Sequence, residues 1–136
     1  MTLYVDTSVI MYAGGADHPK RDGCRAALRA VLDGAEDAVT SAEVVQEILH
    51  RFGRADRQIG TAMAQSTITM FAPLVAIDDA VIARAVDLFA SMPRLSSRDV
   101  IHVAVCRELG IDRILTVDQD FDSVGGLTRV DPDTFL

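Results

Sequence analysis

The chain has 136 residues, a length that suits one domain with a substantial apolar core. Its hydrophobic fraction of 49% and charged fraction of 24% are ordinary for a soluble globular protein and exclude wholesale disorder. The formal net charge of -7 argues against nucleic-acid binding through overall charge. That objection is weakened because Lys20 is the only lysine, and the other basic residues are arginines, which suit bidentate phosphate contacts.

No membrane segment is expected, because no run approaches the roughly 18 apolar residues that span a bilayer. A secretory signal peptide is not expected either, since Asp6 interrupts the opening apolar stretch and no basic region precedes it. Cys24 and Cys106 lack the spacing of a metal or redox motif. We therefore expect reduced thiols in a cytoplasmic protein, with no disulfide and no zinc site.

Apolar runs and helical periodicity predict strands that alternate with helices. The first strand, Leu3–Asp6, is an apolar run with an acid at its carboxyl end, a pattern typical of a buried parallel strand. The helix that begins near Ser96 is apolar on most sides and should be buried. The remaining elements are expected to be helices at 20–32, 42–52, 57–70 and 78–92, and strands at 38–40, 73–77, 113–117 and 127–130. In the helix that ends near residue 92, the predicted inward residues are Val81, Ile82, Ala85, Val86, Leu88 and Phe89.

This alternation predicts an α/β fold with a parallel sheet of about five strands, in a single domain over residues 1–136. Right-handed crossovers limit the topologies and favour the strand order 3-2-1-4-5. In that order the chain reverses between the first and fourth strands, and ligands bind at the carboxyl ends of strands beside such a switch point. Asp6 ends the first strand and Asp118 ends the fourth, so these acids should face each other across one crevice.

Four acids stand at the edges of apolar elements: Asp6, Glu47, Asp99 and Asp118. Gathered in one crevice, their carboxylates would repel one another and raise some of their own pKa values. A hard divalent cation removes that repulsion, and oxygen ligands alone suit Mg²⁺ or Mn²⁺ better than zinc. Such ions generate hydroxide and stabilise the attacking and leaving oxygens of a phosphodiester displacement. The four acids together therefore predict a metal-dependent nuclease site.

Taken singly, each acid also has a local explanation. Asp6 could be a turn residue or a helix cap, and the Ser96-x-x-Asp99 pattern fits a capping box. Glu47 could be a solvated residue on a helix flank, paired with Arg51 one turn later.

The last acid is open as well, because Asp118, Asp120 and Asp122 could each serve the turn after the fourth strand. Ser8 and Thr116 are placed to hydrogen-bond the site carboxylates, although both could equally cap local backbone.

No other catalytic motif is present: the chain has no Gly-rich phosphate loop, no nucleophile elbow and no HExxH. The histidines are scattered. His102 lies three residues after Asp99, and on a mostly apolar helix we expect a packed core residue in preference to a catalyst.

Four short motifs occur along the chain in one order, and together they resemble those of PIN domains, in particular the small VapC-type toxins of bacterial toxin–antitoxin pairs. The resemblance covers essentially the whole chain. The motifs are Asp6-Thr7-Ser8-Val9, Ser41 followed six positions later by Glu47, Arg98-Asp99-Val100-Ile101-His102, and Leu115-Thr116-Val117-Asp118-Gln119-Asp120-Phe121.

The resemblance implies a three-layer α/β/α fold and an endoribonuclease that depends on Mg²⁺, for which Mn²⁺ can substitute. It places Asp6, Glu47, Asp99 and Asp118 in the family's acidic site. Asp120 could replace or join Asp118, and Glu43, one turn from Glu47, could reach the metal through water. The expected roles are metal binding by Asp6, Asp99 and Asp118, and positioning of the water by Glu47. The resemblance also implies a homodimer and a cognate VapB-type antitoxin whose tail enters the active-site groove, with tRNA or rRNA as the substrate.

Arginines near the acids are candidates for contacts with RNA phosphates: Arg51, Arg54, Arg57, Arg94 and Arg98. The first alternative is a PIN-like structure-specific DNA nuclease, which uses the same acidic chemistry, although no inserted arch or helical clamp is present. A phosphatase or phosphoacceptor domain is disfavoured, because position 8 is Ser where an Asp-x-Asp pattern needs Asp, and Lys20 is not on the last strand. The non-enzyme alternative is a catalytically silent interaction module with the same fold.

Overall fold

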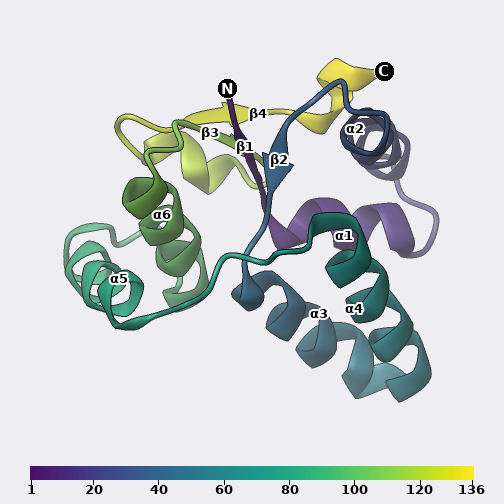
Figure 1. The fold of residues 1–136 in the computed structure, drawn as a ribbon, viewed down its shortest axis with the longest axis horizontal. Coiled ribbons are helices and arrows are strands. Elements are labelled where there is room, and N and C mark those ends of the chain that lie inside the picture. Colours follow the sequence, from purple (N-terminus) through teal and green to yellow (C-terminus); the bar gives the residue numbers. More distant parts are fainter.

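The computed structural model describes residues 1–136, the whole chain (Figure 1). Its sheet has four parallel strands in the order β2-β1-β3-β4. β1 pairs with both β2 and β3, so the residue that follows β1 lies at the centre of the sheet edge. The strands are β1 (Leu3–Val5), β2 (Ala38–Val39), β3 (Arg113–Leu115) and β4 (Thr128–Val130).

Helices lie on both sides of this sheet. In Figure 1, α5 and α6 lie on one side and α1 and α2 on the other, while the α3–α4 hairpin lies beyond the carboxyl ends of the strands. The predicted α/β/α fold is thus confirmed. The helices are α1 (Thr7–Gly14), α2 (Arg21–Leu32), α3 (Ala42–Ala55), α4 (Arg57–Phe71), α5 (Asp79–Ser91) and α6 (Ser97–Leu109), with 3-10 helices η1 (Gln119–Ser123) and η2 (Pro132–Phe135).

The sheet has one strand fewer than predicted, because the stretch 73–77 forms only an isolated bridge between Val75 and Ser41. Val75 donates its backbone N–H to Thr40 at 3.0 Å, and Ala42 donates to the carbonyl of Val75 at 3.0 Å. The stretch therefore lies beside the continuation of β2, where the predicted order 3-2-1-4-5 places it. Pairing extends no further because the neighbouring chain turns into α3 at Ala42.

The core forms where the strands meet α6. Leu3, Tyr4 and Val5 of β1 are fully buried, and the middle of α6 from Val103 to Cys106 is buried on all sides, as its apolar sequence predicts. Cys24 and Cys106 are both buried free thiols, and burial raises their pKa values to about 11 and about 12 respectively. None of the helices is long and apolar enough to cross a membrane.

The prediction for α5 is wrong for half of its apolar residues. Val81, Ala85 and Leu88 are buried as expected, whereas the second stripe is exposed: Ile82, Val86 and Phe89. The reason is that α5 is an outer helix that packs mainly against α6, so only one of its faces meets the core. The exposed residues recur at helical spacing and form an apolar stripe on the surface, here called the α5 stripe.

The α3–α4 hairpin depends on a close approach between two backbones. Asp56 separates the helices and caps α4, because its side chain accepts the backbone N–H groups of Gln58 at 2.9 Å and Ile59 at 3.2 Å. A Cβ atom at Gly60 would lie 2.7 Å from the Gly53 backbone, so only glycine fits there. A Cβ atom at Gly53 itself would meet nothing within 4 Å.

These two glycines give a matched test of the hairpin packing. Gly60→Ala should lower the free energy of unfolding by about 1–3 kcal/mol, because α4 must move away from α3. Gly53→Ala should raise it by about 0.5–1 kcal/mol, since alanine favours the helical conformation. Urea unfolding measures both changes. Similar effects for the two variants would contradict this packing.

Candidate active site

One cavity of about 780 Å³ opens at the carboxyl ends of β1 and β3. The fold brings four of the predicted acids to its wall from four separate elements: Asp6, Glu47, Asp99 and Asp118. This is the crevice that the strand order predicts beside the switch point. Asp120 does not line it.

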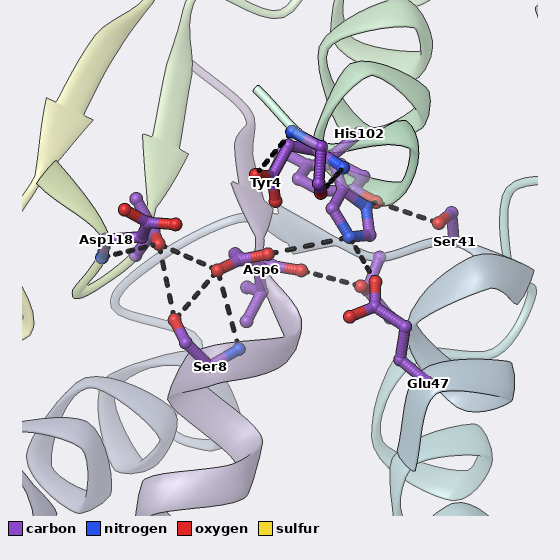
Figure 2. Close-up of polar contacts among 12 residues, drawn as sticks. Tyr4, Asp6, Ser8, Ser41, Glu47, His102 and Asp118 are labelled. Atoms are coloured by element: carbon purple, nitrogen blue, oxygen red, sulfur yellow. Dashed lines mark hydrogen bonds and ion pairs between the residues drawn. The ribbon is translucent and has the colours of Figure 1, made fainter. Parts of the chain in front are cut away.

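Asp6 follows β1 directly and is only 5% exposed. Its Oδ2 accepts hydrogen bonds from the hydroxyls of Ser8 at 2.8 Å and Thr116 at 2.7 Å, and it caps α1 through the Ser8 backbone N–H (Figure 2). The expected contacts of Ser8 and Thr116 with a site carboxylate are therefore present. Asp6 is also the helix cap that its position after a strand suggests, so the structural and the functional interpretation of this residue are compatible.

Glu47 projects from α3 and is 7% exposed, so it is not the solvated flank residue considered from the sequence. It forms no ion pair with Arg51. Its Oε1 lies 2.7 Å from Nε2 of His102. Burial alone would raise the pKa of Glu47, but the hydrogen bond and the charge of His102 outweigh burial and lower it. Glu47 is thus kept as a carboxylate.

His102 belongs to a buried polar chain that the sequence did not reveal. Its Nδ1 lies 2.6 Å from the Tyr4 hydroxyl, and that hydroxyl lies 2.8 Å from Oγ of Ser41 (Figure 2). Nε2 carries a proton and donates to Glu47, while Nδ1 accepts from the Tyr4 hydroxyl when the ring is neutral and donates to it when the ring is protonated. The same Nε2 is 3.6 Å from Oδ1 of Asp6. The chain Ser41–Tyr4–His102–Glu47 therefore connects β1, α6 and the start of α3.

The pKa values of the residues in and near this polar chain are set by burial and by neighbouring charges. Burial alone would lower the pKa of His102, but its hydrogen bond to Glu47 and the negative charges of Asp6 and Glu47 raise it. Burial holds the pKa of Tyr4 well above its usual value, so the hydroxyl keeps its proton. Glu43, considered from the sequence as a more distant acid, has its pKa raised by burial and by the charge of Glu47.

Asp99 occupies the first turn of α6 and forms the predicted capping box. Its Oδ2 accepts the Ser96 backbone N–H at 3.2 Å, and its own N–H donates to the Ser96 hydroxyl at 3.2 Å. Its Oδ1 has no hydrogen-bond partner. Burial, followed by the negative charges of Asp6 and Asp118, raises the pKa of Asp99 above its usual value. Asp99 therefore caps α6, and its pKa also responds to the charges of the other acids.

The structure separates the three acids after β3. Asp118 lines the cavity and caps η1, with Oδ1 accepting the Asp120 backbone N–H at 2.9 Å. Asp120 is exposed and outside the cavity. Asp122 is ion-paired to Arg129 at 2.9 Å. Position thus favours Asp118 as the acid of the site.

The donor atoms suit a hard divalent ion. Carboxylate oxygens of Asp99 and Asp118 remain without hydrogen-bond partners, and the buried Thr7 hydroxyl, which also lines the cavity, has none. Burial, and after it the repulsion from Asp6 and Asp118, raises the pKa of Asp99, and a bound cation would relieve that repulsion. No three acidic or histidine side chains converge closely enough in the structure to enclose an ion. Binding would therefore need the carboxylates to turn inward.

Arginines gather beside the acidic cavity. A second cavity of about 610 Å³ is lined by His50, Arg51, Arg54 and Arg98 together with one alanine, and Arg51 lines both cavities. None of these arginines forms an ion pair or a side-chain hydrogen bond within the chain, whereas Arg21, Arg84, Arg113 and Arg129 are all ion-paired. The predicted candidates Arg57 and Arg94 are likewise unpaired but do not line this cavity. Positive charge is therefore available next to the acids.

The PIN-domain family model matches residues 3–127. The chain belongs to the PIN-domain family. Among its curated relatives, ribonuclease VapC7 of Mycobacterium tuberculosis is 33% identical over an alignment 136 positions long, and the match covers 96% of this chain and 92% of the relative. Ribonuclease VapC23 of the same organism is 35% identical over 121 residues, covering 89% of this chain and 96% of the relative. The resemblance inferred from the four motifs is confirmed.

Solved structures of VapBC and VapC proteins share the fold. VapBC2 from Rickettsia felis, solved with a DNA fragment from its promoter, superposes with a TM-score of 0.75 at 12% identity, covering 96% of this chain and 98% of that chain. VapC20 of Mycobacterium tuberculosis, described as a sarcin–ricin loop cleaving toxin, gives 0.73 at 22% identity, covering 90% and 95%. These similarities confirm the three-layer architecture.

The polar chain through Tyr4 can be tested by removing a single oxygen. Tyr4→Phe leaves the buried Nδ1 of His102 and Oγ of Ser41 without a partner and should lower the free energy of unfolding by about 1–3 kcal/mol. Tyr12→Phe is the matched control, because Tyr12 is a partly exposed residue of the cavity wall whose hydroxyl has no hydrogen-bond partner in the chain, and its loss should change stability by less than about 0.5 kcal/mol. Urea unfolding measures both variants. A Tyr4→Phe protein as stable as the wild type would show that the polar chain through Tyr4 does not hold the site together.

Proposed function

We propose that this PIN-domain protein is a metal-dependent endoribonuclease that acts as the toxin of a toxin–antitoxin pair. The observation that carries the proposal is the gathering of Asp6, Glu47, Asp99 and Asp118 in one cavity. Support comes from the curated relatives VapC7 and VapC23, which are named ribonucleases and align along nearly the whole chain. The proposed substrate is tRNA or rRNA.

In the proposed site, Asp6, Asp99 and Asp118 hold Mg²⁺, which Mn²⁺ can replace, and Asp120 is the alternative to Asp118. When bound, the ion neutralises the clustered carboxylates and supplies the positive charge that phosphodiester hydrolysis requires near neutral pH. Ser8 and Thr116 fix the orientation of Asp6 through its Oδ2.

Glu47 is proposed to position the attacking water and accept its proton. A general base must be ionised at the working pH, and the lowered pKa of Glu47 satisfies that condition. Its carboxylate is held by the hydrogen bond to His102, so it keeps one orientation toward the cavity. His102 is then a positioning residue that acts through Glu47.

The arginines of the second cavity are proposed to bind RNA phosphates on either side of the cleaved bond. Arg51 is central, because it lines both the acidic and the basic cavity. Unpaired guanidinium groups suit this role, since no internal ion pair must break before a phosphate binds. Local positive charge also reconciles RNA binding with a net charge of -7.

The proposal also includes the partners of the protein. A VapB-type antitoxin is the expected inhibitor, supported by the VapBC complexes among the structural neighbours. A homodimer is supported by the α5 stripe of Ile82, Val86 and Phe89, which leaves apolar surface in water on the isolated chain. A cytoplasmic location completes the proposal.

Cleavage of RNA by the purified chain tests the function. With Mg²⁺ or Mn²⁺ the wild-type protein should give discrete RNA fragments, and EDTA should abolish them. Asp6→Asn and Asp118→Asn should each lower the cleavage rate by about 100-fold or more, because each removes a charge from the site. Gel mapping of the fragment ends measures the activity and identifies the cleaved sequence.

Asp120→Asn is the matched control for that experiment, since Asp120 is exposed and lies outside the cavity. It should retain near wild-type cleavage. Loss of activity in Asp120→Asn with activity kept in Asp118→Asn would reverse the assignment of the last acid. Cleavage of single-stranded DNA but not RNA would favour the DNA-nuclease alternative, and metal-independent cleavage would contradict the proposed site.

A further inference from the structure

The acidic cavity has an aromatic part that the proposed chemistry does not use. Tyr12, near the end of α1, and His18, in the loop before α2, both line it together with the four acids. Their rings lie against each other, with centroids 4.6 Å apart and planes inclined by 36°. Tyr4, the other tyrosine of the chain, is fully buried in the core, so Tyr12 is the tyrosine that a ligand can reach.

The His18 ring is held in place from one side only. Its Nδ1 accepts the backbone N–H of Lys20 at 3.1 Å, which leaves the proton on Nε2 when the ring is neutral. Neither Nε2 of His18 nor the Tyr12 hydroxyl has a hydrogen-bond partner in the chain. Two aromatic rings in mutual contact, each with a polar atom that has no partner in the chain, therefore lie at the wall of the cavity.

Packing of the loop against α1 accounts for the contact between the two rings but not for their exposed polar edges. An unpaired nucleobase uses both features, because single-stranded RNA is recognised by stacking of bases on aromatic side chains and by hydrogen bonds to the base edges. The cavity volume of about 780 Å³ is large enough for a phosphate at the acids and an adjoining base. In RNA, a base is attached one sugar away from every phosphate.

We propose that Tyr12 and His18 form a nucleobase-binding subsite that holds an unpaired base of the RNA next to the cleaved phosphodiester. This inference rests on the proposed ribonuclease function and adds to it the element that selects substrate: an unpaired base beside the cut. Arg51 and the second cavity bind the backbone without regard to sequence, whereas the aromatic pair contacts a base.

The test uses a short single-stranded RNA that carries 2-aminopurine at one position, scanned along the strand, and its counterpart with an abasic site at that position. Titrations are run on the full-length protein in EDTA, and again in Mg²⁺ with Glu47→Gln to slow cleavage. Stacking quenches 2-aminopurine fluorescence, so the wild-type protein should quench at one preferred position. It should bind the base-containing strand about tenfold or more tightly than the abasic strand, as expected for one stacked base.

Tyr12→Ala should abolish the quenching and most of the difference between the two strands, while Tyr12→Phe, which keeps the ring, should retain both. Met11→Ala is the matched control, because Met11 lines the same cavity without a ring. The proposal is overturned if Tyr12→Ala weakens both strands equally, if wild-type protein quenches at no position, or if Tyr12→Ala impairs only binding of the antitoxin. Unchanged melting temperatures verify folding of each variant.

The two proposals fail in different ways. RNA cleavage that proceeds with unchanged rate and base preference in Tyr12→Ala removes the subsite and leaves the nuclease. Quenching that depends on Tyr12 in a protein that cuts no RNA leaves the subsite and removes the nuclease.

Discussion

Asp6 is buried at the centre of the sheet edge, where a carboxylate is costly unless hydrogen bonds compensate for the lost contact with water. Its Oδ2 accepts hydrogen bonds from the hydroxyls of Ser8 on α1 and Thr116 after β3, two residues separated by most of the chain. Those bonds fix how α1 leaves β1 and how β3 ends beside it. The remaining carboxylate oxygen, Oδ1, lies on the side of His102 and Glu47, 3.6 Å from Nε2 of His102. Folding and the proposed chemistry thus impose the same requirement on this residue.

A second buried polar chain extends that arrangement to the helices. Tyr4 lies two residues before Asp6, so both side chains point to the same face of the strand. Through His102 the Tyr4 hydroxyl is connected to Glu47, and through Ser41 to the start of α3. Because every member is buried and bonded to the next, α3 and α6 cannot shift independently of β1 without leaving polar groups unpaired. Glu47 is therefore placed by the core itself.

Sequence patterns predicted the fold well where a local rule decides the structure. Apolar runs and right-handed crossovers give the strand order, and only the stretch 73–77 falls short, because α3 starts at Ala42 and removes its pairing partner. The α5 stripe was misjudged because periodicity cannot tell an outer helix from one packed on both faces. The predicted capping box of Asp99 is present, and Asp99 also lines the cavity, so the two interpretations of this residue do not exclude each other. His102 was expected only to pack; its bonds join residues up to 98 positions apart, and the one available signal was that it shares a helix face with Asp99.

The proposed function depends most on joint binding of one or more divalent ions by Asp6, Asp99 and Asp118. The most direct test is anomalous diffraction from crystals of the wild-type protein soaked in Mn²⁺. An anomalous peak should appear in the acidic cavity, within coordination distance of these three carboxylates. A cavity without a peak at saturating Mn²⁺, or a peak bound only by acids outside it such as Asp120, would contradict the claim.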